Sequence, residues 1–323
     1  GIVSKLPRFE TPDLLVGMET MDDAGVYRLS PEQALVQTVD FFYPIVNDPG
    51  SFGRIVAANS LSDIWAMGAR AITAMNHLAY PAGQIPAEAI EALLSGGSEK
   101  LTEAGVALVG GHTLEQTEMV YGMSVTGLIH PERATRNASV RPGQLLVLTK
   151  PLGTGIYCNA YRQDGLSPDL YRVWVEGMER LNMYAARILE DYDTGGMTDV
   201  TGFGLLGHAL PMARYSGSRI VFSASSVPLL PGLPGLMDEY NPKGVCKCRQ
   251  FVADHLEVVE GIDSRLVTLF SESQTSGGLL FSVDPAQAEE VLKRLHEEGD
   301  TASAIVGHVE KRQGDDPLLR VEP

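Results

Sequence analysis

Cysteine is scarce in this chain, and long apolar runs are missing from it. The three cysteines, Cys158, Cys246 and Cys248, are too few for a disulfide framework, so the sequence predicts a reducing compartment, the cytoplasm. The lone C-x-C lacks the second cysteine pair that a structural zinc site needs. No run approaches the ~18 apolar residues of a membrane-spanning helix, and no signal peptide is visible.

Basic residues are few relative to acidic ones. Lys and Arg number 25 against 41 Asp and Glu, which gives a net charge of -16. Because nucleic acids and anionic membranes are bound through basic patches, this balance argues against both kinds of partner. The chain also lacks the G-x-x-x-x-G-K-[ST] phosphate loop and the H-R-D and D-F-G sequences of protein kinases, so an ATP site here would be of another kind.

The length of 323 residues and the hydrophobic content of 44% predict an ordinary globular protein of two domains. The best boundary is the turn sequence Arg141-Pro142-Gly143, which precedes a fresh apolar run. We therefore expect one domain over residues 1–142 and a second over residues 143–323.

A helix over residues 53–68 is the clearest element of the first domain. Asp48 and Pro49 supply an N-cap and a first-turn proline ahead of it, and Gly68 suits its end. Its many small residues predict close packing and burial. Asn59 and Asp63 lie four residues apart and therefore share one face. A carboxylate on a buried helix is costly unless it is paired or binds a metal.

The remaining pattern alternates strands with helices. We expect strands at 34–39, 71–80, 106–109, 119–129, 145–150 and 304–309, and helices at 86–104, 168–191 and 286–298. The sequence at 110–113 is expected to form a turn, either an ordinary one or one whose N–H groups face an anion. Lys150 is either a surface lysine, which we favour, or a phosphate contact. Residues 197–208 are expected to form a loop that leads into a short helix.

Five aspartates flank apolar elements beside glycine, threonine or asparagine: Asp22, Asp23, Asp40, Asp63 and Asp199. Hard divalent cations such as Mg²⁺ bind carboxylate oxygens and bridge them to phosphates. Together with the Gly-rich turns, these acids predict a site for a divalent metal and a triphosphate.

Six stretches closely resemble the selenophosphate synthetases (selenide, water dikinases), relatives of aminoimidazole ribonucleotide synthetase. They are LLVGMETMDDAGVY at 14–27, TVDFFYPIVNDPGSFGRIVAANSLSDIWAMGA at 38–69, GGHT at 110–113, LTKPLGTG at 148–155, MTDVTGFGLLGH at 197–208 and SQTSGGLL at 273–280. The resemblance implies an α/β protein whose N-terminal domain has a mixed sheet and forms a homodimer, with a C-terminal α/β domain beside the ATP site.

The resemblance also implies the reaction and the site. ATP, selenide and water would give selenophosphate, AMP and phosphate, and a selenium-delivery protein is a further partner to consider. The Mg²⁺ ligands would be Asp23, Asp63 and Asp199. The ATP contacts would be Thr20, Met21, Asp22, Asp40, Gly111, His112 and Thr113. Asn59 would orient Asp63 or a phosphate.

One departure from the family concerns the start of the chain. The family has a Gly-rich segment with a cysteine or selenocysteine three residues before a catalytic lysine. Lys5 is too near Leu14 to be that lysine, and no cysteine precedes Cys158. We therefore expect an ATP and Mg²⁺ site without these catalytic groups. The alternatives are an ATP-binding homologue without turnover, acting as a regulatory or partner subunit, and another ATP-using enzyme of the superfamily.

Overall fold

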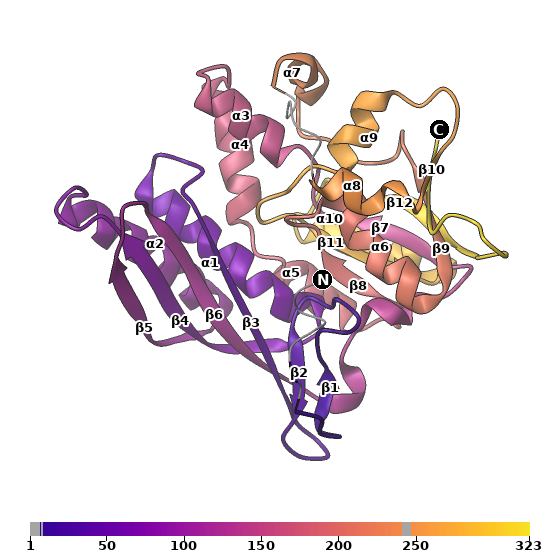
Figure 1. Ribbon diagram of the computed structural model, residues 1–323, viewed down its shortest axis with the longest axis horizontal. Coiled ribbons are helices and arrows are strands. Elements are labelled where there is room, and N and C mark those ends of the chain that lie inside the picture. Colours follow the sequence, from indigo (N-terminus) through magenta and orange to yellow (C-terminus); the bar gives the residue numbers. More distant parts are fainter. Residues whose placement is uncertain (1–6, 8, 241–246) are drawn as a thin grey trace.

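Two mixed β-sheets, one from each half of the chain, form the framework (Figure 1). The computed structural model describes residue 7 and residues 9–240 and 247–323. Lys5 and Cys246 lie outside these residues. Among the described residues, no helix is long and apolar enough to cross a membrane.

The first sheet has the strand order β1-β2-β3-β6-β4-β5, with only β4 and β5 parallel. Its strands are β1 (Leu14–Val16), β2 (Gly25–Arg28), β3 (Ala34–Phe42), β4 (Arg70–Tyr80), β5 (Ala107–Glu115) and β6 (Val120–Ile129). Its helices are α1 (Pro49–Ala66) and α2 (Ala87–Ala104). Two short 3-10 turns, η2 (Pro131–Arg133) and η3 (Asn137–Ser139), lead into the second half.

The second sheet has the order β10-β13-β9-β12-β7-β11-β8. Its strands are β7 (Leu145–Leu148), β8 (Met197–Asp199), β9 (Ser218–Ser223), β10 (Leu256–Val258), β11 (Leu279–Val283), β12 (Ala304–Lys311) and β13 (Leu319–Glu322). Its helices are α3 (Thr154–Arg162), α4 (Pro168–Glu179), α5 (Met183–Leu189), α6 (Gly204–Ser216), α7 (Leu233–Tyr240), α8 (Lys247–Ala253), α9 (Ser264–Phe270) and α10 (Pro285–Glu297). The predicted α/β class and the mixed sheet of the first half are confirmed, and the second sheet is mixed as well.

Helix α1 is the central element of the first half. The side chain of Asp48 caps it by accepting a hydrogen bond from the Ser51 N–H at 2.7 Å, and Pro49 is its first residue. From Ser51 to Ala66 every residue except Arg54 is buried, so the predicted burial is confirmed. It packs on β3 and β6 on one side and reaches α4, α5 and β8 of the second half. Helix α1 therefore joins the two halves of the molecule.

Glycines bring α1 and α2 unusually close. A Cβ atom added at Gly53 would lie 1.9 Å from the carbonyl oxygen of Leu93, and one at Gly96 would lie 2.1 Å from that of Gly50. Both contacts are with backbone, which cannot swing aside as a side chain can. The glycines are therefore required by the packing of the two helices, not by their conformation.

Several sequence predictions need correction. The helix predicted over 168–191 is two helices, because Arg180 between α4 and α5 has extended backbone (ψ 127) and its carbonyl accepts a hydrogen bond from Lys150. Residues 197–208 contain strand β8 and the start of α6, a 13-residue helix, where we expected a loop before a short helix. Tertiary contacts outweigh local sequence preference at both places.

The segment predicted as a buried strand and a turn at 106–113 belongs to β5, an exposed strand at the edge of the sheet. Ala74 of β4 pairs with Leu108 of β5, and Asn76 pairs with Gly111. The step is two residues along β4 but three along β5, so β5 has one extra residue here. The glycine pair therefore accommodates a bulge. A Cβ atom at Gly111 would lie 2.3 Å from the carbonyl oxygen of Asn76.

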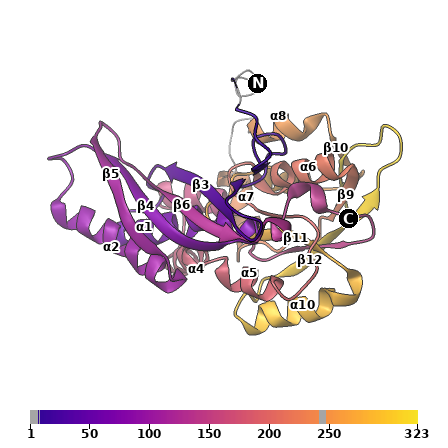
Figure 2. The same cartoon turned by 90° about the horizontal axis from the view of Figure 1, so that it is seen from below.

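One face of the first sheet is bare in the part of the chain that the structure describes. Figure 2 shows α1 and α2 on one side of β3 to β6, and no described helix on the other. Apolar side chains are exposed along these strands, among them Val39 (52%), Phe41 (62%), Met75 (43%) and Val109 (59%). An apolar face of this kind is typical of a surface that another chain covers.

We predict that Gly53→Ala lowers the free energy of unfolding by about 1–3 kcal/mol, because the new methyl group overlaps backbone of α2. The matched control is Gly177→Ala in α4, where a Cβ atom meets nothing within 4 Å. That variant should gain about 0.5–1 kcal/mol from helix propensity. Urea unfolding of both variants would measure the two changes in stability. Equal unfolding midpoints for both variants would contradict the packing argument.

Candidate metal and phosphate site

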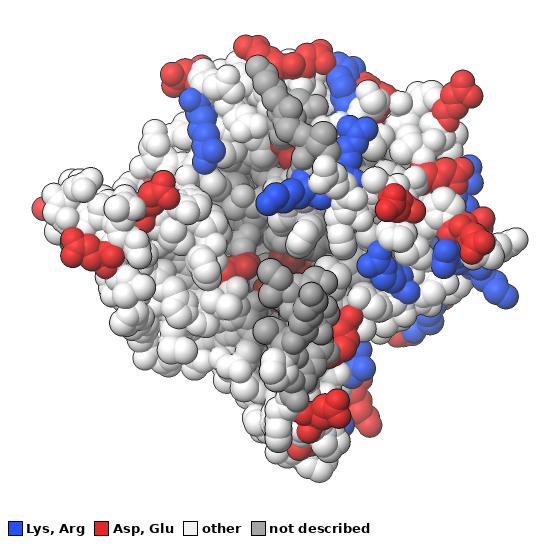
Figure 3. Space-filling model, viewed as in Figure 1, with Lys and Arg blue, Asp and Glu red and all other residues white. Residues whose placement is uncertain are grey.

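An acidic cavity of about 310 Å³ lies where the two halves meet. Asp22, Asp23, Asp40, Asp63 and Asp199, the five aspartates singled out in the sequence, all line it. Figure 3 shows acidic atoms at the floor of a hollow in the middle of this face, with Lys and Arg side chains on the half above it.

Four different elements carry these carboxylates. Asp40 lies near the end of β3, Asp63 in the last turns of α1, and Asp199 at the end of β8. Asp22 and Asp23 lie in the loop between β1 and β2, after Met21, whose φ of 54° is unusual for a residue with a side chain. The cavity therefore forms only when both halves are folded and packed together.

Three of the carboxylate oxygens lack a hydrogen-bond partner among the described residues, although they are buried: Asp23 Oδ2 and both oxygens of Asp199. The other oxygen of Asp23 accepts a hydrogen bond from Thr198 Oγ1 at 2.6 Å, and Asp63 accepts one from Thr38. Buried oxygens without partners are rare in proteins because losing hydration costs free energy. Such oxygens are suited to a hard cation.

Burial is the main cause of unusual acidity in the cavity. It raises the pKa of Asp199 to about 7 and that of Asp40 to about 6. The nearby Ser62 hydroxyl acts the other way and lowers the pKa of Asp199, while the charge of Asp40 raises it. The pKa values of Asp23 and Asp63 are raised well above their usual range, by burial and then by the charge of Asp199. The carboxylates therefore repel one another in a cavity where burial weakens the screening by water.

His208 on α6 is a residue that the sequence analysis did not single out. One ligand atom each from Asp23, Asp199 and His208 lies within 4.8 Å of the other two. Its Nε2, however, accepts hydrogen bonds from the N–H groups of Thr201 (3.2 Å) and Phe203 (3.3 Å). That nitrogen is therefore unprotonated, and its lone pair is engaged. Burial also lowers the pKa of His208 to about 4, so the ring is neutral.

The other ring nitrogen of His208 then carries the proton. It lies 3.5 Å from Thr198 Oγ1, the hydroxyl that donates to Asp23. His208 thus holds the loop from Thr201 to Phe203 and supports Asp23 through Thr198. We assign it a structural task in the site, and the carboxylates remain the metal-ligand candidates. The sequence signal that could have identified His208 was its position at the end of the Gly-Phe-Gly-Leu-Leu-Gly-His sequence.

The polar residues predicted near the aspartates have definite partners. Asn59 Nδ2 donates to Asp40 Oδ2 at 2.8 Å, so Asn59 orients Asp40 and not Asp63. Thr20 donates to Asp22, which also accepts from the Asn137 N–H at 2.6 Å. Asn137, on η3, is a cavity residue that sequence reasoning missed.

Two predictions do not fit this cavity in one chain. Gly111, His112 and Thr113 lie on β5 and are not among the residues that line it. Lys150, for which a surface position was favoured, is 7% exposed, and burial lowers its pKa to about 7. Its ammonium group donates to the carbonyl oxygens of Arg180 and Ser276, so neither expected role of Lys150 describes its contacts.

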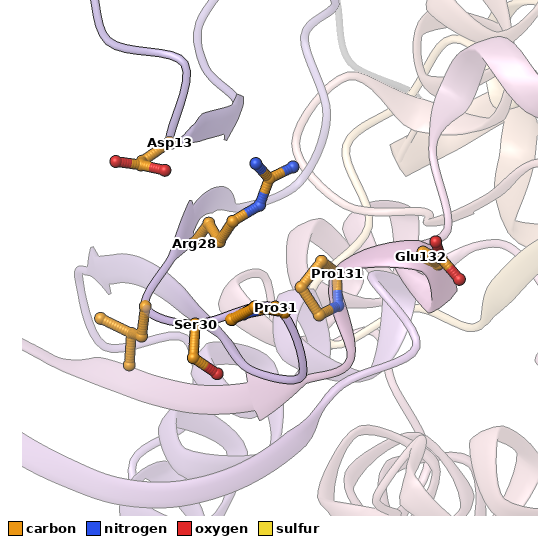
Figure 4. A pocket seen from close by; sticks show the side chains of 7 residues that line it. Asp13, Arg28, Ser30, Pro31, Pro131 and Glu132 are labelled. Atoms are coloured by element: carbon orange, nitrogen blue, oxygen red, sulfur yellow. The ribbon is translucent and has the colours of Figure 1, made fainter.

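A second hollow, of about 430 Å³, lies away from the five aspartates. Figure 4 shows Arg28 between Asp13 and Pro131, with Glu132 at the far side. None of the predicted site residues lines it. The acidic cavity, although smaller, therefore remains the candidate site.

Comparison with known proteins identifies the class first. Two family models match: that of the AIR synthase related protein, N-terminal domain, at residues 21–129, and that of the C-terminal domain at 141–319. Two solved structures share the fold: E. coli HypE, a hydrogenase maturation protein (TM-score 0.69, 19% identity, 98% of this chain and 90% of that one), and AaThiL complexed with AMPPCP and TMP (TM-score 0.69, 16% identity, 93% and 87%). The chain belongs to this class of protein.

A curated relative then identifies the family within this class. The selenide, water dikinase of Geobacter metallireducens is 45% identical over 309 residues, which cover 95% of this chain and 90% of the relative. The chain therefore belongs to the selenide, water dikinase family and is an enzyme. The resemblance inferred from the sequence stretches is confirmed.

We predict that the metal-free protein loses stability as pH rises from about 4 through about 7. The folded-state pKa values of Asp23, Asp40, Asp63 and Asp199 lie above the usual 3.8, so the folded state binds more protons than the unfolded state in this range. Thermal unfolding at pH 5 and pH 8 without metal would measure the effect.

Mg²⁺ should reverse that trend, because it must displace the protons. At pH values below the pKa of a ligand carboxyl group, the affinity for Mg²⁺ should rise by about tenfold per pH unit for each proton that binding releases. Titration calorimetry at pH 6 and pH 8 measures this directly. Equal affinity at the two pH values would contradict a site built from these carboxylates.

Proposed function

We propose that this chain converts ATP, selenide and water to selenophosphate, AMP and phosphate. The observation that carries the proposal is the set of buried carboxylate oxygens without partners in a cavity between the two halves. The 45% identity to a protein named selenide, water dikinase supports the choice of reaction. The solved structure of AaThiL is a complex with AMPPCP, a compound related to ATP, and this supports a nucleotide site on the shared fold.

Within the cavity we assign Asp23, Asp63 and Asp199 to Mg²⁺. Hard carboxylate oxygens suit this ion, and three of the six oxygens have no other partner among the described residues. When bound, Mg²⁺ would neutralise the triphosphate, both of whose anhydride bonds are broken in the reaction. Met21, Asp22 and Asp40 line the same cavity, and we assign them, with Thr20, to the nucleotide.

We also propose the domain boundary at residues 142 and 143. The strands of the first sheet end at Ile129, those of the second begin at Leu145, and the two family models meet between residues 129 and 141. The first domain would form a homodimer through the bare face of its sheet and β5. In that assembly Gly111, His112 and Thr113, exposed on β5, would lie at the interface, where they would reach a partner's nucleotide.

The dimer is tested by sedimentation. The expected mass is twice 34.8 kDa. Phe41→Asp should shift the protein to the monomer, because it places a charge on the 62% exposed apolar face. The control is Val258→Asp, at a 40% exposed apolar position on the second sheet. A parent protein that sediments as a monomer would contradict the proposal.

The reaction is tested by anaerobic ³¹P NMR of the protein with MgATP and selenide. We expect a selenophosphate signal with AMP and phosphate in equal amounts. The need for a cysteine or selenocysteine and a lysine ahead of Leu14 stays a prediction. Shifted ATP resonances without selenophosphate would instead favour an ATP-binding homologue without turnover.

Asp63→Asn is the matched variant for that experiment. It removes a charge and keeps the volume, so MgATP binding and turnover should both be lost. The metal-free variant should unfold at the same temperature as the parent or higher, because a buried carboxylate repelled by Asp199 has been replaced by a neutral amide. Unchanged MgATP affinity in calorimetry would exclude Asp63 as a ligand.

A further inference from the structure

Lys150 is a buried lysine that the proposed reaction does not use. It lies two residues after the end of β7, and its side chain is buried. Its Nζ donates to the carbonyl oxygen of Arg180 at 2.7 Å and to that of Ser276 at 2.9 Å. Burying an ammonium group is costly, so a position of this kind needs a reason.

Ser276 supplies the link to the acidic cavity. Its backbone has a φ of 47°, in the left-handed region that residues with a side chain rarely occupy, so this conformation is held by its surroundings. Its N–H donates to Asn59 Oδ1 at 2.9 Å. The amide of Asn59 then donates to Asp40 Oδ2 at 2.8 Å. Three hydrogen bonds thus connect Lys150 to a carboxylate of the cavity.

The direction of these hydrogen bonds determines the orientation of the Asn59 amide. Because the Ser276 N–H can only donate, it requires the oxygen of the Asn59 amide on its side and leaves the NH₂ group facing Asp40. The opposite orientation would place the amide oxygen against a carboxylate. The segment that contains Ser276 also contacts the loop from Thr201 to Phe203, where the Gln274 N–H donates to the Thr201 carbonyl oxygen at 2.9 Å.

We propose that Lys150 is a positioning residue for Asp40: by holding the Ser276 carbonyl oxygen it restrains the backbone of Ser276 on both sides of its Cα, so that the Ser276 N–H fixes the orientation of Asn59, and so the carboxylate oxygen that faces the nucleotide. The proposal rests on the proposed role of Asp40 in binding MgATP. It assigns Lys150 no contact with substrate.

The test measures MgATP affinity by calorimetry in Lys150→Met, Lys150→Gln and the control Lys293→Met, whose side chain is 73% exposed on α10. Methionine nearly keeps the length and removes the donors, and we expect about tenfold weaker binding. Glutamine is shorter than lysine but still donates, so its loss should be smaller, about threefold. The control should match the parent.

A double-mutant cycle with Asn59→Ala separates positioning from general damage to the fold. If Lys150 acts through Asn59, the loss caused by Lys150→Met should vanish in the Asn59→Ala background. Should the methionine variant not fold, the glutamine variant and its cycle give the same test. Losses that simply add, or a folded Lys150→Met variant that binds as tightly as the parent, would overturn the proposal. A parent that binds no MgATP would overturn the proposed function itself.

Discussion

Repulsion between buried carboxylates is the constraint on which the site depends. Asp23, Asp40, Asp63 and Asp199 come from both halves of the chain and meet in one cavity, where Asp63 and Asp199 are buried and Asp23 and Asp40 are half-buried. Without a cation their proximity disfavours folding at neutral pH, since burial raises the pKa values of all four and mutual repulsion adds to those of Asp23, Asp63 and Asp199. The surrounding structure must therefore be rigid enough to hold them together, and a divalent cation relieves the repulsion.

The rigidity comes from α1 and from the loops that contact it. Helix α1 carries Asn59 and Asp63 and is held against α2 by glycines that allow backbone contact. From the second half, Ser276 N–H reaches Asn59, and Asn182 Nδ2 donates to Ser62 Oγ at 2.8 Å. These contacts fix one face of α1 against the second sheet. The cavity is thus a product of the interface between the halves, and neither sheet alone could form it.

The sequence predicted what depends on local pattern. The buried helix with its cap, the α/β class and the group of five aspartates could all be found from spacing, small residues and the residue types next to apolar runs. What it could not predict depends on tertiary contact. The break at Arg180 follows from a hydrogen bond to a lysine 30 residues away in the chain, and Asn59 faces Asp40 because Ser276, 217 residues on, determines its orientation. The bulge in β5 was mistaken for a turn because two glycines suit both.

Lys150 illustrates why such residues escape sequence reasoning. A lone lysine after an apolar strand is normally at the surface or at a phosphate, and the structure shows neither. Its ammonium group donates to two carbonyl oxygens, and the charges of Asp300 and Asp199 partly offset the cost of its burial. Its proposed task becomes clear when the backbone of Ser276 is followed from the carbonyl oxygen to the N–H, and from there to Asn59 and Asp40. A lysine that holds backbone in this way can orient Asp40 without pairing with it, which leaves the charge of that carboxylate available for the metal-nucleotide complex.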